Sequence, residues 1–359
     1  MNKEYTALGL MSGTSGDGVD ASIIRSDGKN KCEVILNKYF VYDKKLYQDI
    51  HELKDLINKS EDLKKFHKKI DSLERKITLF HSEVINNLSA TNIDFVGFHG
   101  QTIYHNAEQK VSKQLGNGKL LSQITKKNIV YNFRQNDLIN GGQGAPLTPI
   151  FHKLLISQKK IKLPVTILNI GGISNITLMD TKNKIYSSDI GPGNCLIDQW
   201  IRINSKKNYD DKGEIAESGF INKIILDQSL DNFYNNDISK KRSYDTQDFD
   251  ISFVRGLSLE DGAATLTEFT SQIISKKILS DNIYASGGGR KNKFLLSRLG
   301  KILGKKIKLI DELNIEGDFV ESQAFAYIAI RSYLGELISF PETTGCSKAC
   351  SGGVLIKPT

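Results

Sequence analysis

The sequence predicts an α/β protein made of two duplicated lobes, and three observations along its 359 residues support this fold class. Residues 5–25 read as a strand, a turn rich in glycine and hydroxyl groups, and a second strand, which is the pattern of a β-hairpin. A similar strand, glycine-rich turn and strand begin about 160 residues later. Segments with helical periodicity follow both hairpins. The repeated unit favours two lobes, whose turns face one another across a cleft, over one doubly wound sheet.

Length and composition agree with a folded protein of this size. A chain of 359 residues exceeds a usual single domain, and its 39% hydrophobic and 25% charged residues are close to the globular average. The sequence contains no apolar run of about 18 residues, and its start, MNKEYTALGLMSG, lacks the pattern of a secretory signal. We therefore expect a cytoplasmic protein that does not enter a membrane.

The net charge of +8 raises the question of a nucleic-acid partner. The lysines around residues 64–69 lie beside acidic residues in a helical pattern, without interleaved aromatic residues or a recognisable reader motif. A solvated helix face is the favoured interpretation, so no nucleic acid is expected.

The four cysteines, Cys32, Cys195, Cys346 and Cys350, form no CxxC pair and have no neighbouring histidine to complete a zinc set. We interpret them as reduced thiols. Cys346 and Cys350 could ligate a metal, but their proximity in the sequence is more often incidental.

Periodicity gives the order of the other elements. Residues 44–88 carry apolar residues in steps of four and three, which predicts an amphipathic helix packed on a sheet. Further helices are predicted near 220–234, near 259–279 and from residue 293, and strands at 93–98 and 282–285. Because no low-complexity linker separates the halves, we predict closely joined lobes of residues 1–130 and 131–359. An alternative stays open, in which the C-terminal helices pack back on the first lobe.

The first hairpin turn has the chemistry of a phosphate-binding loop. Its residues, Gly13, Thr14, Ser15, Gly16, Asp17 and Gly18, offer backbone N–H groups and two hydroxyls to an anion. Plain hairpin turns often contain Asp-Gly as well, so the pattern alone fits a structural turn and a phosphate loop equally well. It is not a Walker A sequence, because the GKS or GKT ending and the following helix are missing.

Two further glycine clusters repeat this chemistry. They are Gly171 and Gly172 with Ser174 and Asn175 in the second hairpin, and Gly287, Gly288 and Gly289, where a flat ligand could lie against the backbone. The arrangement resembles the two phosphate loops and the adenosine loop of the acetate and sugar kinase, heat-shock and actin superfamily. This resemblance implies a two-lobed actin-like (ribonuclease H-like) ATPase fold, with the nucleotide between duplicated lobes.

Asp189 is the candidate catalytic carboxylate. In the segment SSDIGPGNCLIDQW it ends a short β-like stretch and precedes a glycine-rich turn and an apolar helical run. A carboxylate at this place could act as a base toward a water or a hydroxyl. The alternative is that Asp189 caps the turn, a role that is less needed because Asn194 is expected to cap the helix.

Two polar segments are candidates for binding a carbohydrate with an acidic substituent. Residues 99–102 and 132–146 are dense in hydrogen-bonding groups and in glycine. Arg134 could pair with a carboxylate in a forked geometry. A lone histidine or arginine is more often structural, but the density of polar side chains beside glycines favours substrate binding.

Seven motifs, in order, are similar to those of the anhydro-N-acetylmuramic acid kinase family: GLMSGTSGDGVD, FHGQTIYH, NFRQNDLINGGQGAPLTP, LNIGGISNIT, SDIGPGNCLIDQW, ASGGGRKN and VESQAFAYIAIRSYLG. The match runs nearly end to end, and GQGAPL and DIGPGN distinguish this group from glucokinases and acetate kinases. The resemblance implies that ATP and water convert 1,6-anhydro-N-acetylmuramic acid to N-acetylmuramic acid 6-phosphate and ADP in peptidoglycan recycling, with ring opening and phosphorylation coupled.

The resemblance also implies a role for each motif. Asp189 would be the general base that activates water for attack on the anomeric carbon, and Asp17 would organise the water shell of Mg²⁺. The residues that contact the ATP phosphates would be Gly13, Thr14, Ser15, Gly16, Asp17, Gly18, Val19, Asp20, Gly171 and Gly172. Those that lie near the adenosine would be Gly287, Gly288 and Gly289. The residues toward the sugar would be His99, Gln101, Arg134 and Glu321, with Arg134 facing the lactyl carboxylate.

Two positions depart from the family's pattern. Gly16 stands where a larger apolar residue is common, and Asn132 stands where aspartate is common. The first could loosen the phosphate loop and the second removes a charge near the sugar site, so both bear on affinity more than on the reaction class. The resemblance alone also suggests a homodimer.

Two rival functions stay open. One is a kinase of the same superfamily that acts on another sugar or on a carboxylic acid, since its nucleotide loops would be of the same kind. The other is a non-catalytic, actin-like nucleotide-binding protein. Asp189 beside a set of polar loops argues against the second rival, because a scaffold has no use for a base.

Overall fold

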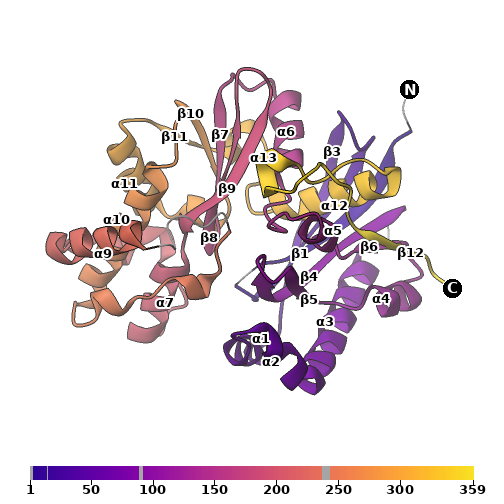
Figure 1. Cartoon of the computed structure of the whole chain (residues 1–359), viewed down its shortest axis with the longest axis horizontal. Coiled ribbons are helices and arrows are strands. Elements are labelled where there is room, and N and C mark those ends of the chain that lie inside the picture. Colours follow the sequence, from indigo (N-terminus) through magenta and orange to yellow (C-terminus); the bar gives the residue numbers. More distant parts are fainter. Residues whose placement is uncertain (1–2, 14, 89–91, 237–242) are drawn as a thin grey trace. The chain divides into compact units, whose positions relative to one another are not determined.

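The computed structural model describes residues 3–13, 15–88, 92–236 and 243–359 (Figure 1). The chain forms two compact units: unit 1 consists of Met1–Lys160 and Phe319–Thr359, and unit 2 of Ile161–Asp318. Each unit combines a mixed β-sheet with helices, which confirms the predicted α/β class. The division lies at residue 160 and not at residue 130, because β6 (Ile129–Tyr131) pairs with β4 (Phe95–Asn106) inside the sheet of unit 1.

Unit 1 is built on a sheet with the strand order β12-β6-β4-β1-β2-β3, and β5 pairs with β4. The remaining strands are β1 (Tyr5–Ser12), β2 (Gly18–Ser26), β3 (Cys32–Val41), β5 (Val111–Leu115) and β12 (Val354–Ile356). The first three strands are antiparallel, β4 is parallel to β1, and β6 is parallel to β4. The hairpin predicted over residues 5–25 is therefore present. The sequence analysis missed β3, because this edge strand is mostly exposed and has no alternation of buried and exposed residues.

The helices of unit 1 are α1 (Lys44–Leu56), α2 (Ser60–Lys65), α3 (His67–Asn87), α4 (Gly118–Thr125), α5 (Gln135–Ile139), α6 (Pro149–Gln158), α12 (Val320–Leu334) and α13 (Pro341–Thr344). The single helix predicted over residues 44–88 is wrong, since three helices occupy this region. The first break lies at Asn58 and Lys59, whose backbone N–H groups donate to the Asp62 carboxylate. α12 is buried at Val320 and from Ser322 to Arg331 and packs against β1, β2 and β4, which places the C-terminal segment in unit 1.

Unit 2 has the sheet order β11-β10-β7-β8-β9. Its strands are β7 (Val165–Ile170), β8 (Ile173–Met179), β9 (Ile185–Pro192), β10 (Asn282–Ser286) and β11 (Ile307–Leu309). β7, β8 and β9 are antiparallel, β10 is parallel to β7, and β11 is parallel to β10. Both units therefore contain three antiparallel strands, continued by two parallel strands on the other side of the first strand. This shared topology confirms the duplication predicted from the two hairpins.

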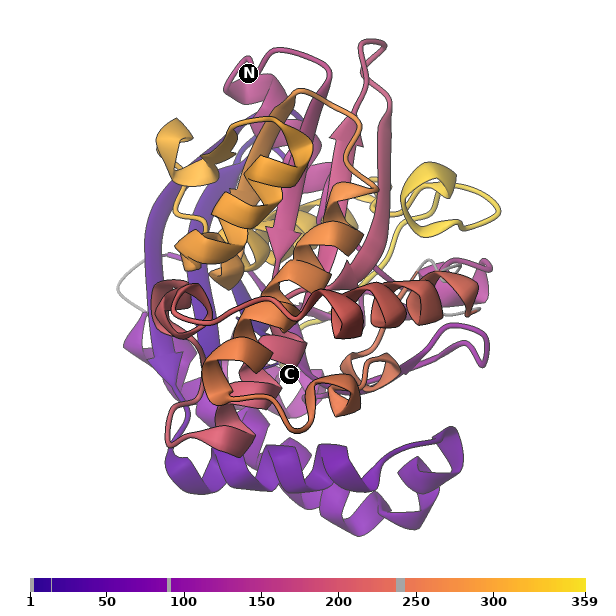
Figure 2. The same cartoon turned by 90° about the vertical axis from the view of Figure 1, so that its left-hand side faces the viewer.

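The helices of unit 2 are α7 (Cys195–Asn204), α8 (Glu214–Glu217), α9 (Lys223–Asn235), α10 (Leu259–Ser275) and α11 (Lys293–Leu303), with short 3₁₀ turns that include η5 (Gly288–Lys291) and η6 (Ile310–Leu313). The predicted helices near 220–234, near 259–279 and from residue 293 correspond to α9, α10 and α11. The ribbons of α10 and α11 lie over the sheet of unit 2 (Figure 2). Leu168 of β7, Ile274 of α10 and Leu295 of α11 belong to one buried hydrophobic cluster. Within the described ranges, no helix has both the length and the apolar character that a membrane span requires.

Candidate functional site

The loop between β1 and β2 is held in place by side chains from other elements of unit 1. The Gln101 amide donates from Nε2 to the Gly13 carbonyl at 2.9 Å, and His51 Nε2 lies 2.9 Å from the Ser15 carbonyl. Gly16 has φ +62°, in the left-handed region that favours glycine. Thr14 lies outside the described residues. Side chains from α1 and β4 thus hold the described part of the loop, Gly13 and Ser15–Asp17.

Carboxylates gather at the end of this loop. Asp17 is exposed and accepts a hydrogen bond from Ser15 Oγ at 2.6 Å, and Asp20 follows on β2. Burial and the charges of Asp17 and Asp20 raise the pKa of Tyr39, so both carboxylates are near the Tyr39 hydroxyl. Oxygen ligands of this type suit Mg²⁺. The side chain of Val19, in contrast, is fully buried in the hydrophobic core.

The buried residue His99 and the half-buried residue Arg134 form a hydrogen-bonded pair. The Arg134 guanidinium donates to His99 Nε2, at 3.2 Å from Nε and at 2.8 Å from Nη2, and to the Gly144 carbonyl at 2.7 Å. His99 Nδ1 lies 2.8 Å from the Gly100 carbonyl. Burial and the charge of Arg134 hold the pKa of His99 well below its usual value. His99 is therefore the neutral tautomer with its proton on Nδ1, and its first role is to orient Arg134.

Asp137, which the sequence analysis did not single out, supports the glycine-rich loop beside Arg134. Its carboxylate accepts the Gly144 N–H at 2.6 Å and the Thr344 hydroxyl at 2.5 Å. Cys346 and Cys350 lie next to it, and one ligand atom from each of the three residues falls within a distance of 4.8 Å from the others. Burial raises the pKa of both thiols, which favours the thiol over the thiolate. All four cysteines lie in the described ranges and are free, in agreement with the reduced thiols that we expected.

Glu321 and Asn132 are two further positions of unit 1 that the sequence analysis singled out. Glu321 is in the first turn of α12 and is half-buried. Asn132 has φ +59°, a conformation that asparagine adopts more readily than most residues, and its side chain is exposed.

In unit 2, the turn between β7 and β8 is held by backbone groups. The N–H groups of Gly193 and Cys195 donate to the Gly172 carbonyl at 2.9 and 3.1 Å, and the Asn194 N–H donates to the Gly171 carbonyl at 2.8 Å. Two motifs that are separate in the sequence are thus joined at the start of α7. Asn194 occupies the N-cap position of α7, but its side chain makes no cap hydrogen bond, so the predicted capping role is wrong. The amide instead lies near Gly289, 3.0 Å from the position that a Cβ would take there.

Asp189 lies on β9 at a β-bulge. The pairing of β8 with β9 shifts between Ser174 and Asn175, and Asp189 is the register partner of Asn175. Bulges next to active sites commonly redirect a side chain. Oδ2 of Asp189 accepts the backbone N–H of Tyr244 at 3.0 Å, a contact between distant segments that the sequence could not reveal. Burial and the Asp189 charge raise the pKa of Tyr244 to about 12, so the Tyr244 hydroxyl stays protonated.

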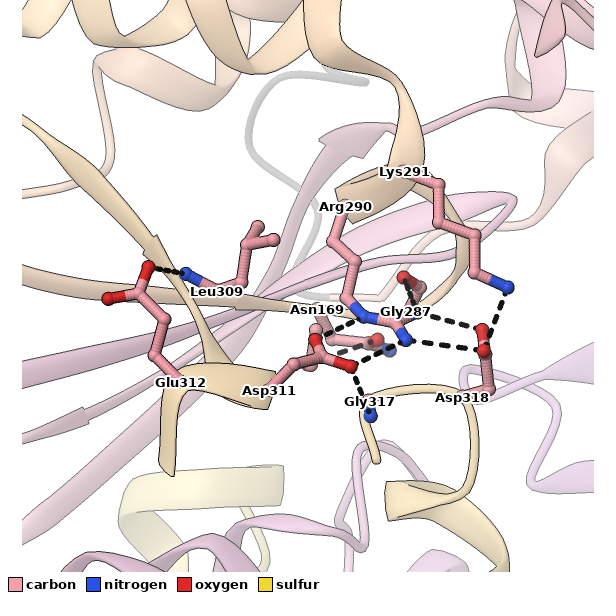
Figure 3. A network of polar contacts seen from close by, with 10 residues as sticks. Asn169, Gly287, Arg290, Lys291, Leu309, Asp311, Glu312, Gly317 and Asp318 are labelled. Carbon is pink, nitrogen blue, oxygen red and sulfur yellow. Dashed lines mark hydrogen bonds and ion pairs between the residues drawn. The ribbon is translucent and has the colours of Figure 1, made fainter. Parts of the chain in front are cut away.

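The glycine cluster at 287–289 is supported by Arg290, which Figure 3 shows between two carboxylates. The guanidinium donates to Asp311 from Nε at 2.7 Å and from Nη2 at 3.0 Å, and to Asp318 from Nη1 at 2.7 Å and from Nη2 at 3.2 Å. The fifth donor reaches the Gly287 carbonyl at 3.0 Å. All five N–H groups of Arg290 are thus used, and they fix the loop that the resemblance assigned to adenosine.

The candidates fall into two groups. Unit 1 holds Gly13, Ser15–Asp20, His99, Gln101, Arg134 and Glu321, and unit 2 holds Gly171, Gly172, Asp189 and Gly287–Gly289. Two copies of one strand topology, each with a glycine-rich turn after its first strand, define a protein of the actin-like (ribonuclease H-like) class.

Comparison with known proteins identifies the family. The family model described as anhydro-N-acetylmuramic acid kinase matches residues 5–358, so the chain belongs to this family. The curated protein of that name from Pelagibacter ubique is 54% identical over 374 residues, covering 99% of this chain and all of the relative. The one from Rhizobium etli is 35% identical, covering 100% of both. Component A of the (R)-2-hydroxyglutaryl-CoA dehydratase from Acidaminococcus fermentans has a TM-score of 0.47 with 14% identity, covering 92% of this chain and 99% of that one.

Proposed function

We propose that the protein uses ATP and water to convert 1,6-anhydro-N-acetylmuramic acid to N-acetylmuramic acid 6-phosphate and ADP in peptidoglycan recycling. The observation that carries this proposal is the family match over residues 5–358, which includes every loop described above. The relatives from Pelagibacter and Rhizobium bear the name of this kinase.

Asp189 is the general base of the proposed reaction. Its carboxylate takes a proton from the water that attacks the anomeric carbon, and the freed O6 then takes the γ-phosphoryl group. The hydrogen bond from the Tyr244 N–H to Oδ2 at 3.0 Å orients the carboxylate.

The glycine-rich turns bind the phosphates of ATP. The β1–β2 loop offers backbone N–H groups in a conformation fixed by Gln101 and His51, and the 171–172 turn lies at the start of α7, where a helix dipole favours an anion. The carboxylates of Asp17 and Asp20 fit a Mg²⁺ ion, Asp17 through its water shell. When bound, that ion offsets the charge that develops on the phosphoryl group.

Arg134 binds the lactyl carboxylate of the sugar. The bonds to His99 and to the Gly144 carbonyl hold its guanidinium in one orientation, as recognition of a planar carboxylate requires. An Arg134→Ala variant is expected to raise the Michaelis constant for the sugar. An unchanged constant would show that Arg134 does not bind the carboxylate.

A substrate panel tests the proposed function. ADP release is measured with Mg-ATP and, in turn, 1,6-anhydro-N-acetylmuramic acid, N-acetylmuramic acid, glucose and acetate, and the sugar product is analysed by mass. We expect release with the anhydro sugar and a product that has gained one water and one phosphoryl group. Release with glucose or acetate alone would favour the rival kinases, and ATP binding without any acceptor-dependent release would favour the non-catalytic rival.

We also infer a cytoplasmic homodimer. The homodimer rests on the family resemblance alone. Sedimentation of the purified chain at micromolar concentration tests it, since a single species with the mass of one 40.1 kDa chain would contradict the dimer.

A further inference from the structure

A cross-strand pair places a second polar group beside Asp189. Asn175 on β8 is the register partner of Asp189 on β9, and Ile190 is the additional residue of the bulge that follows. Directly opposed residues of antiparallel strands point to the same face, with Cβ atoms about 4.5–5.5 Å apart. The two side chains can therefore contact one small molecule.

The amide oxygen of Asn175 can accept a hydrogen bond, but the described residues supply no donor for it. Oδ1 is enclosed, and no group in the part of the chain that the structure describes donates a hydrogen bond to it. The neighbouring Ser187 hydroxyl is used elsewhere, because it donates to the Ile176 carbonyl at 2.6 Å. Enclosed acceptors are almost always satisfied in folded proteins, by a protein group, a ligand or a bound water.

A water molecule is the donor that suits this pair. An amide oxygen and a carboxylate oxygen are both acceptors and cannot bond to each other, whereas water has two protons and can donate one to each. We propose that Asn175 is a catalytic residue that holds the attacking water together with Asp189. This inference rests on the proposed function and adds a residue to its site.

The reaction step balances with these groups. The water O–H bond that faces Asp189 breaks and the proton goes to the carboxylate, while the oxygen bonds to the anomeric carbon. The bond from the anomeric carbon to O6 breaks and O6 keeps the electron pair, then bonds to the γ-phosphorus as ADP leaves. Asn175 accepts a hydrogen bond from the second water proton throughout, which directs a lone pair of the oxygen at the carbon.

The neutral amide also preserves the base. A second carboxylate at the position of Asn175 would lie next to Asp189, and two carboxylates that share one place raise the pKa of one of them. The base would then be protonated over a wider pH range. An amide accepts the same hydrogen bond without this effect.

The test uses Asn175→Ala and Asn175→Asp, with Asn183→Gly as the matched control. Asn183 lies in the exposed turn between β8 and β9 with φ +62°, where glycine fits without strain. We measure kcat and the Michaelis constants for both substrates, the pH dependence of kcat, and the melting temperature of each variant. Asn175→Ala should lower kcat about a hundredfold with an unchanged Michaelis constant for ATP. Asn175→Asp should move the acidic limb of the kcat profile to higher pH, and the control should match the natural protein.

Each outcome decides a different point. If Asn175→Ala keeps kcat within about twofold of the natural protein, or if Asn175→Asp leaves the acidic limb in place, Asn175 does not hold the water. If the natural protein itself gives no sugar-dependent ADP release, the proposed function fails first and the assignment of Asn175 fails with it. A loss of kcat that merely follows a loss of melting temperature would show a structural role and would also overturn the proposal.

Discussion

The two hairpin turns of the molecule arise from the same strand topology but are held by different means. The loop after β1 is fixed by the side chains of Gln101 and His51, which bond to the Gly13 and Ser15 carbonyls. The turn after β7 is fixed by the backbone N–H groups of residues 193–195, which bond to the Gly171 and Gly172 carbonyls. A loop held by side chains can be loosened by replacing one of those polar side chains, even where it is far away in the sequence. A turn held by backbone groups is sensitive above all to a side chain that pushes the two segments apart.

Among the substitutions that compare the loops, the largest effect is expected from Gly193→Ala. A Cβ at this position would lie 2.3 Å from the Gly171 carbonyl oxygen, so the turn and the start of α7 must separate. We expect kcat/KM to fall by at least about a hundredfold, because a displacement of about 1 Å at a site has that effect. Gly300→Ala in α11 is the control and should change kcat/KM little. Normal activity of Gly193→Ala would show that the backbone bonds between the segments are not needed.

Arg290→Lys should have the next largest effect, through the adenosine loop. Lysine has three donors and cannot replace the five that reach Asp311, Asp318 and Gly287. Because the two carboxylates are partly exposed, we expect a loss of about 2 kcal/mol in the free energy of unfolding, less than for a fully buried pair. The Michaelis constant for ATP should rise with it. Lys291→Ala, which removes only an exposed ion pair to Asp318, should leave both unchanged.

Gln101→Leu tests the loop held by side chains and also sharpens the role of Gln101. Its amide bonds to Gly13, so the substitution should weaken the phosphate loop and raise the Michaelis constant for ATP about tenfold, the effect of one lost hydrogen bond. The resemblance assigned Gln101 to the sugar. A rise in the Michaelis constant for the sugar alone would support that assignment and contradict the role in the phosphate loop.

The smallest effect at neutral pH concerns stability, and it comes from His81 in α3. Burial lowers the pKa of His81 to about 4, so the folded protein holds this residue neutral. The unfolded chain takes up the proton below a pH of about 6.5, so the free energy of unfolding is complete above that pH and falls by about 3 kcal/mol toward pH 4. His81→Phe should make this fall smaller in urea unfolding measured across that range, while His99 and His152, whose pKa values burial also lowers, keep their share of it. The exposed residue His67 is the control, and His67→Asn should keep the natural pH dependence.

The sequence predicted the elements that carry a local pattern. Both hairpins, the strands at 93–98 and 282–285 and the helices α9, α10 and α11 were found from periodicity, because their buried faces repeat at a fixed spacing. The edge strand β3 lacks such a face and was missed. The break between α1 and α2 depends on one carboxylate, Asp62, that accepts two backbone N–H groups, and the apolar spacing continues across it.

For the candidate site, the sequence indicated the loops but not what holds them. The glycine-rich turns and Asp189 stood out by residue type and order. The contact of Asp189 with the Tyr244 N–H, the register that pairs it with Asn175 and the bonds from Gln101 to Gly13 join segments far apart in the chain. No spacing in a single sequence reports such contacts. The Asn194 prediction failed for a related reason, since a residue at an N-cap position can direct its side chain elsewhere.

The most direct test of the central claim is sugar-dependent ADP release by the natural protein and by Asp189→Asn, measured in parallel with 1,6-anhydro-N-acetylmuramic acid and Mg-ATP. Asparagine keeps the shape of the side chain and can still accept the Tyr244 N–H, but it cannot take a proton from water. We expect turnover by the natural protein and a fall in kcat of about a thousandfold or more in the variant, as the loss of a general base produces. Turnover by Asp189→Asn within about tenfold of the natural rate would contradict the assignment of Asp189 as the base.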